Sequence, residues 1–111
     1  AYSVYRIAGD FIFASGQIPL NPQTNELVSG DIATQTKQVL ENIRGILEEN
    51  GLNFNHIVKT TVFLADINDF AMMNEVYASF FKAPCPARSA VAVKDLPKGA
   101  KVEIEIIAHK A

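Results

Sequence analysis

The segment from Pro86 to Ile106, PARSAVAVKDLPKGAKVEIEI, contains two stretches of alternating side chains separated by turn-forming residues. Residues 89–94 and 101–108 follow the period of two that is typical of β-strands. Between them, Leu96-Pro97-Lys98-Gly99 supplies the proline and glycine of a turn. Any fold of this chain must therefore place two strands near its C-terminal end, and pairing as a hairpin is the simplest arrangement.

Such a hairpin would bring Arg88 towards the carboxylates of Glu103 and Glu105 on the second strand. A guanidinium group forms two parallel hydrogen bonds with a planar carboxylate, and a nearby glutamate can move a proton or hold a water molecule. These groups are the minimum equipment for chemistry on a small carboxylic acid. Spacing alone favours the ordinary alternative, a solvated ion pair at the protein surface.

Three further strands are expected, at residues 4–8, 11–15 and 57–65. Gly9-Asp10 between the first two is typical of a two-residue hairpin turn with glycine at its first central position. Two helices complete the pattern. The first is predicted over residues 32–50, with Asp31 as its N-cap and Gly51 ending it. Its buried face is expected to carry Ile32, Thr36, Val39, Leu40, Ile43, Ile46 and Leu47.

The second helix is predicted to start near Asp66 or Asn68 and to end before Pro84. Its apolar stripe consists of Phe70, Met73, Val76, Tyr77 and Phe80. The order ββαβαββ predicts a single α+β domain over residues 1–111, a sandwich with two helices on one face of a mixed sheet. A chain of 111 residues has room for one core.

Two helices cover only one sheet face, yet the expected strands carry apolar residues on both faces. In the third strand, one face is predicted to hold Val58, Val62 and Leu64, and the other Ile57, Thr61 and Phe63. In the last strand Val102, Ile104 and Ile106 alternate with Glu103, Glu105 and Ile107. An uncovered face of this kind predicts a homo-oligomer, and the alternative is a monomer with a mildly apolar face.

The composition limits the possible partners. A net charge of −2 and a pI of about 5.6 do not favour nucleic-acid binding. No apolar run is long enough for a membrane span, and no secretory signal is visible, so a cytoplasmic protein is expected. A location in an organellar matrix is the alternative if a leader is missing.

Cys85, the only cysteine, cannot form an internal disulfide and is expected to be a passive loop thiol. No metal-ligand spacing or nucleotide-binding motif is present.

Several blocks together resemble the RidA (YjgF) family of reactive-intermediate imine deaminases. The C-terminal block is PARSAVAV…LPKGAKVEIEI, and the first block is Ser15-Gly16-Gln17-Ile18-Pro19-Leu20. The central block runs from Lys59-Thr60-Thr61-Val62-Phe63-Leu64 through Asn68-Asp69-Phe70 to Asn74-Glu75-Val76-Tyr77. The resemblance covers essentially the whole chain. It implies a chorismate-mutase-like sandwich that forms a homotrimer, with the sheets around a central barrel and the sites in clefts between subunits.

The resemblance also implies an activity, the hydrolysis of C=N bonds in 2-imino acids and their enamine tautomers. Examples are 2-aminoacrylate and 2-aminocrotonate/2-iminobutanoate, which would yield 2-keto acids and ammonia without a metal or organic cofactor. The implied partner is a small imino or keto acid. Arg88 is similar to the family's carboxylate-binding arginine, and Glu103 to its catalytic glutamate, which would position or activate the attacking water.

Further residues match pocket positions of that family, namely Tyr2, Ser15, Gly16, Asn74 and Ala90. Each has an ordinary alternative. Tyr2 could be a frayed terminal aromatic, Ser15 and Gly16 could be strand-end turn residues, and Asn74 could be a residue at the core margin. The family commonly reads Gly-Pro-Tyr-Ser-Gln near its start, whereas here Val4-Tyr5-Arg6 follows Tyr2-Ser3, so substrate preference is expected to differ.

Two rival functions stay open. The same cleft could serve a non-catalytic sensor of keto or imino acids, which needs Arg88 but not Glu103. Members of this family are also linked to RNA cleavage and translation inhibition, which the acidic balance of this chain does not favour.

Overall fold

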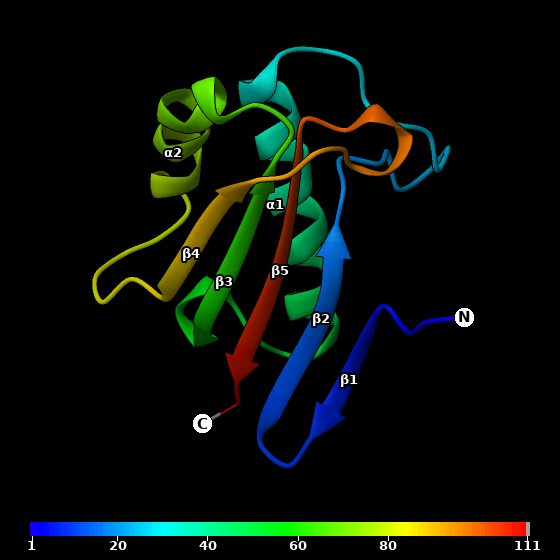
Figure 1. The fold of residues 1–111 in the computed structure, drawn as a ribbon. Helices are drawn as coiled ribbons and strands as arrows, with labels where there is room; N and C mark the ends of the chain where they lie inside the picture. Colours follow the sequence, from blue (N-terminus) through cyan, green and yellow to red (C-terminus); the bar gives the residue numbers. More distant parts are fainter. Residues whose placement is uncertain (111) are drawn as a thin grey trace.

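The computed structural model describes residues 1–110 and confirms the predicted ββαβαββ order (Figure 1). The elements are β1 (Tyr5–Ala8), β2 (Phe11–Gln17), α1 (Ile32–Glu49), β3 (Ile57–Leu64), α2 (Phe70–Ala78), β4 (Ala87–Ala92) and β5 (Val102–His109). The five strands form one open mixed sheet, and both helices lie on the same side of it (Figure 1). The α+β class with two helices on one sheet face is therefore confirmed.

The strand order is β1-β2-β5-β3-β4, so the hairpin expected between the last two strands is wrong. β4 pairs in parallel with β3, and β5 pairs antiparallel with both β3 and β2. β5 takes the central position because every second side chain along it is buried. β4 is more exposed and suits an edge. Residues 93–101 are long enough to pass the end of β3, which a tight hairpin turn could not do.

The core lies between the sheet and the helices. The sheet contributes Ile12, Val62, Leu64, Val102, Ile104 and Ile106, and α1 contributes Val39, Leu40, Ile43 and Leu47. The opposite side of the sheet, here called the open face, is covered by no part of residues 1–110. Its exposed apolar side chains include Phe11, Phe13 and Val91. The prediction of apolar residues on both faces is thus confirmed.

One detail of the third strand was predicted wrongly. Ile57 is buried with a 4% exposed fraction, whereas Val58 is 43% exposed, the reverse of the expected phase. A β-bulge causes the change, because Ile57 pairs with Ala108 while Lys59 pairs with the adjacent Ile107. The extra residue shifts the alternation of side chains at the start of β3.

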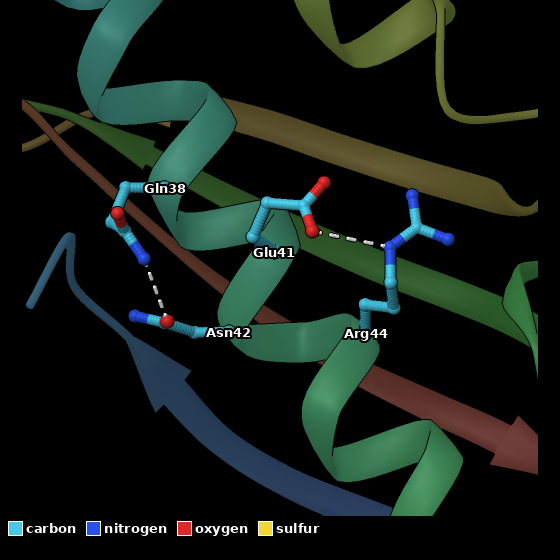
Figure 2. Close-up of polar contacts among 4 residues, drawn as sticks. All are labelled: Gln38, Glu41, Asn42 and Arg44. Carbon is cyan, nitrogen blue, oxygen red and sulfur yellow. Dashed lines mark hydrogen bonds and ion pairs between the residues drawn. The ribbon is translucent and has the colours of Figure 1, made fainter. Parts of the chain in front are cut away.

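The ends of α1 follow the predicted signals. The Asp31 side chain accepts a hydrogen bond of 2.9 Å from the Thr34 N–H, and Gly51 has a positive φ of 72° after the last turn. On the polar side of the helix, Gln38 donates to Asn42 at 2.9 Å, and Arg44 pairs with Glu41 at 3.2 Å (Figure 2). Among residues 1–110, neither helix has the length and apolarity needed to cross a membrane.

Candidate functional site

The first half of the site surrounds Arg88 on the helix side of the sheet. Arg88 lies on β4 opposite Thr60 of β3, and both side chains point towards α2. The Arg88 Nη1 donates a hydrogen bond of 2.6 Å to the Asn74 Oδ1. Its Cζ lies 4.8 Å from the ring centroid of Tyr77 and 5.4 Å from that of Phe70. We name these four residues, Phe70, Asn74, Tyr77 and Arg88, the arginine half-site.

Arg88 has no acidic partner in this environment. Among residues 1–110, no carboxylate lies within 4.0 Å of its guanidinium group. The guanidinium group carries a positive charge, which two aromatic rings and one amide do not neutralise. A half-buried cation with unused donors is the arrangement expected for binding an anionic ligand, and a planar carboxylate matches the guanidinium geometry best.

The second half of the site lies where β2 bends away from β5. The register between these strands shifts between Ala14 and Gln17, so a bulge contains Ser15 and Gly16. The Glu103 carboxylate of β5 lies against Gly16. Ser15 fixes the N-terminal segment, since its N–H donates to the Val4 carbonyl at 2.8 Å and its hydroxyl to the Ser3 carbonyl at 2.6 Å.

A groove of about 1030 Å³ opens beside this bulge and extends towards α1. Its lining includes Tyr2, Val4, Ser15, Gly16 and Glu103, so four of the predicted site residues face one cavity. Tyr2 is 82% exposed and can reorient. We name Tyr2, Ser15, Gly16 and Glu103 the glutamate half-site.

Glu103 is electrostatically unusual. Partial burial raises the pKa of its carboxyl above the ordinary value, and repulsion from Glu105 on the same strand face raises the pKa further. A carboxylate with a raised pKa holds protons nearer to neutral pH, which suits a general base or acid. Among residues 1–110, no basic group lies within 4.0 Å of the Glu103 carboxylate, so Glu103 is not part of the surface ion pair that its spacing from Arg88 had favoured.

The two half-sites do not meet within one chain, contrary to the arrangement expected from a hairpin. Arg88 lies opposite Thr60, whose side chain is buried under the helices, whereas Glu103 lies opposite Phe63 on the open face. Because β3 lies between the strands that carry Arg88 and Glu103, these strands are about 10 Å apart across the sheet. The two residues are also offset along the strand direction, which increases their separation. Ala90 lies two residues beyond Arg88 on the same strand face and packs against the core.

The sequence interpretation missed the roles of Phe70 and Tyr77, which it assigned only to an apolar core stripe. Both contact the Arg88 guanidinium, and together with Asn74 they occupy positions i, i+4 and i+7 of one helix face. The sequence contained one signal for this cluster, an asparagine between two aromatic residues on the same helix face. A face that only packs against the core contains apolar residues, so the amide indicates a polar partner.

The fold defines a class, the α+β proteins with two helices on one face of an open five-stranded mixed sheet. The sequence model of the family described as endoribonuclease L-PSP matches residues 1–110. The chain therefore belongs to this family, which is also called the RidA (YjgF) family.

Relatives and solved structures agree with this assignment. The RutC family protein PH0854 of Pyrococcus horikoshii is 56% identical over 109 residues, covering 98% of this chain and 86% of that protein. The human 2-iminobutanoate/2-iminopropanoate deaminase is 48% identical over 107 residues, covering 96% of this chain and 78% of that protein. The crystal structure of E. coli TdcF with bound serine has a TM-score of 0.92 at 44% identity, covering 100% of this chain and 89% of that one.

Gly16 offers a direct test of the glutamate half-site. A Cβ on this residue would lie 2.8 Å from the Glu103 Cδ, so Gly16→Ala should displace a flexible carboxylate rather than any backbone. We expect the free energy of unfolding to change by less than about 1 kcal/mol, while any activity that depends on the Glu103 carboxylate falls by roughly 10²-fold because the carboxylate is misplaced by about 1 Å. Thermal melts and steady-state kinetics would check this expectation.

The matched control is Gly45→Ala in α1, where an added Cβ meets nothing within 4 Å. It should stabilise the protein by about 0.5–1 kcal/mol, because alanine is the better helix former. Normal turnover in Gly16→Ala would show that the position of the Glu103 carboxylate against Gly16 does not matter for catalysis.

Proposed function

We propose that this protein hydrolyses 2-imino acids and their enamine tautomers, such as 2-aminoacrylate and 2-iminobutanoate, to 2-keto acids and ammonia. The observation that carries the proposal is the unpaired guanidinium of Arg88, held by two aromatic rings and the Asn74 amide. A relative at 48% identity is named as a 2-iminobutanoate/2-iminopropanoate deaminase, which supports this choice of substrate class.

In the proposed mechanism, Arg88 binds the substrate carboxylate through two parallel hydrogen bonds. Glu103 accepts a proton from a water molecule as the water oxygen bonds to C2 of the imine. Glu103 returns this proton to the former imine nitrogen, which gives a tetrahedral aminoalcohol. The proton of its hydroxyl group then moves to the nitrogen through the same carboxylate, the C–N bond breaks, and ammonia leaves as the C2 carbonyl forms. One water is consumed, and the carboxyl group ends in its starting protonation state. Positioning of the water and the imine contributes the larger share of the rate.

We further propose that the site forms between subunits of a homotrimer. Arg88 and Glu103 lie on opposite sides of one sheet, so a single substrate can reach both only if they come from different chains. The exposed apolar residues of the open face supply the surface for assembly around a central barrel.

The assembly makes a testable prediction. Phe13 is 44% exposed on the open face, so Phe13→Glu would place a charge in the proposed interface. We expect monomers by light scattering coupled to gel filtration, and loss of nearly all turnover because the half-sites separate. Ile7→Glu is the control, since Ile7 is similarly exposed, at 46%, on the other side of the sheet. An active, trimeric Phe13→Glu would contradict the proposed interface.

The experiment that tests the activity uses threonine dehydratase in excess to generate 2-iminobutanoate, so that hydrolysis of the imine limits the rate. Formation of 2-oxobutanoate is then followed with and without the assembled protein. Acceleration above the spontaneous rate is expected, and its loss in Arg88→Ala and Glu103→Ala would assign both residues.

The rival functions give different results in the same setting. A sensor would bind 2-oxobutanoate without accelerating hydrolysis of the imine. The endoribonuclease activity in the family's description would appear as cleavage of single-stranded RNA, which the net charge of −2 does not favour. Running all three assays on one preparation separates these possibilities.

A further inference from the structure

One face of α2 is built around the Arg88 side chain. Phe70, Asn74 and Tyr77 follow one another at i, i+4 and i+7, and each contacts the guanidinium group. The amide takes up the Nη1 donor in a hydrogen bond of 2.6 Å, and the two rings face the central carbon at 4.8 Å and 5.4 Å. A guanidinium confined in this way loses freedom before a ligand arrives.

Tyr77 is the most firmly held member of this set. Only 5% of its surface is exposed, and its hydroxyl is hydrogen-bonded to the Thr60 hydroxyl at 2.8 Å. Thr60 is fully buried on β3, and its Cα lies opposite that of Arg88 in the sheet register. The same side chain therefore joins α2 to the strand that flanks Arg88 and presents its ring to the cation.

We propose that Tyr77 is a positioning residue, which sets the orientation of the Arg88 guanidinium and so determines affinity for the ligand carboxylate. The inference rests on Arg88 as the carboxylate-binding group of the proposed function, but it does not depend on turnover. Arginine has a long side chain with many rotamers, so holding its plane in advance reduces the loss of freedom on binding. The ring attracts the cation without using up the N–H donors that the carboxylate needs.

The expected result is a loss of carboxylate affinity that depends on the aromatic ring. Tyr77→Leu should raise the dissociation constant for 2-oxobutanoate by roughly 2- to 30-fold, the range of a cation–π contact between exposed and desolvated settings. Tyr77→Phe keeps the ring, so its dissociation constant should stay within about threefold of wild type, although loss of the Thr60 hydrogen bond lowers stability. In turnover, KM should rise in Tyr77→Leu while kcat changes little.

A double-mutant cycle with Arg88→Ala tests the coupling. Once Arg88 is absent, Tyr77→Leu should change the dissociation constant by less than about twofold, because the ring then has no cation to position. Ligand-observed NMR reaches the millimolar affinities that Arg88→Ala requires. Phe80→Leu is the matched control, since the Phe80 ring makes the same kind of contact, at 5.5 Å, with Arg44 instead of Arg88.

Gel filtration and thermal melts would establish that each variant is assembled. If Tyr77→Leu does not assemble, Phe70→Leu replaces it in the cycle, because Phe70 is only partly buried and provides the second ring. An equal loss of affinity in the presence and absence of Arg88, or a loss matched by Phe80→Leu, would overturn the inference. Binding of 2-oxobutanoate without any hydrolysis of the imine would defeat the proposed activity and leave this inference standing.

Discussion

Replacement of Arg88 by alanine is expected to weaken binding of 2-oxobutanoate and to lower kcat/KM by roughly 10²- to 10³-fold. Truncating one partner of a desolvated, hydrogen-bonded charge pair costs about 2–5 kcal/mol, and each 1.4 kcal/mol is a factor of ten. The carboxylate is bound in the ground state as well as in the transition state, so most of the loss should fall on KM. Isothermal calorimetry and the coupled assay measure the two quantities separately.

The conservative variant Arg88→Lys distinguishes charge from geometry. Lysine supplies a cation but neither the fork of donors nor the flat group that lies against Phe70 and Tyr77. We therefore expect partial recovery, with affinity still about tenfold below wild type. Arg44→Ala is the control, because Arg44 also contacts two aromatic rings but pairs with Glu41 on α1. Full activity in Arg88→Lys would show that charge alone is sufficient.

The local patterns predicted the elements well because each depends on nearby residues. Alternation identified β5, and Asp31 and Gly51 marked the ends of α1. The pairing of the strands was harder to predict, because alternation of side chains indicates a strand but not which other strand it pairs with. The α2 crossover connects β3 to β4, so these two strands pair in parallel. Because β4 occupies one edge of β3, β5 pairs with the other edge.

The alternation of side chains did not predict where the candidate site residues lie relative to one another within one chain. The resemblance selected Arg88 and Glu103; in the structure Arg88 is hydrogen-bonded to Asn74, and the pKa of the Glu103 carboxyl is raised by partial burial and by Glu105. Their separation depends on register, because Thr60 and Phe63, the β3 residues opposite them, point to different sides of the sheet. The bulge at Ser15 and Gly16 was also invisible in sequence, since neither residue type demands one.

Replacement of Glu103 by glutamine is expected to reduce kcat by roughly 10²- to 10⁴-fold, the usual contribution of a general base or acid. Glutamine keeps the volume of the side chain beside Gly16 but accepts no proton at the pH of the reaction. Because the variant also removes a negative charge near the ligand, the affinity for 2-oxobutanoate should be unchanged or slightly higher. Loss of affinity in place of turnover would assign Glu103 to binding.

The pH dependence identifies the same carboxyl. Since burial and Glu105 both raise its pKa, the acid limb of kcat should lie above pH 4.5, the ordinary value for glutamate, and should disappear in Glu103→Gln. Glu105→Gln removes the repulsion from Glu105, which is the smaller of the two causes of the raised pKa. The acid limb of kcat should therefore move to lower pH, while the maximal kcat stays unchanged. Ionisation of Glu103 is less favourable in the folded state than in the unfolded state. The free energy of unfolding contributed by this carboxyl therefore falls as the pH rises, whereas a salt-bridged acid stabilises the fold as the pH rises. Glu103→Gln should therefore be more stable than wild type at neutral pH, with the difference vanishing in acid as wild type becomes protonated. An acid limb that stays in place in Glu105→Gln and persists in Glu103→Gln would assign the titration to another group.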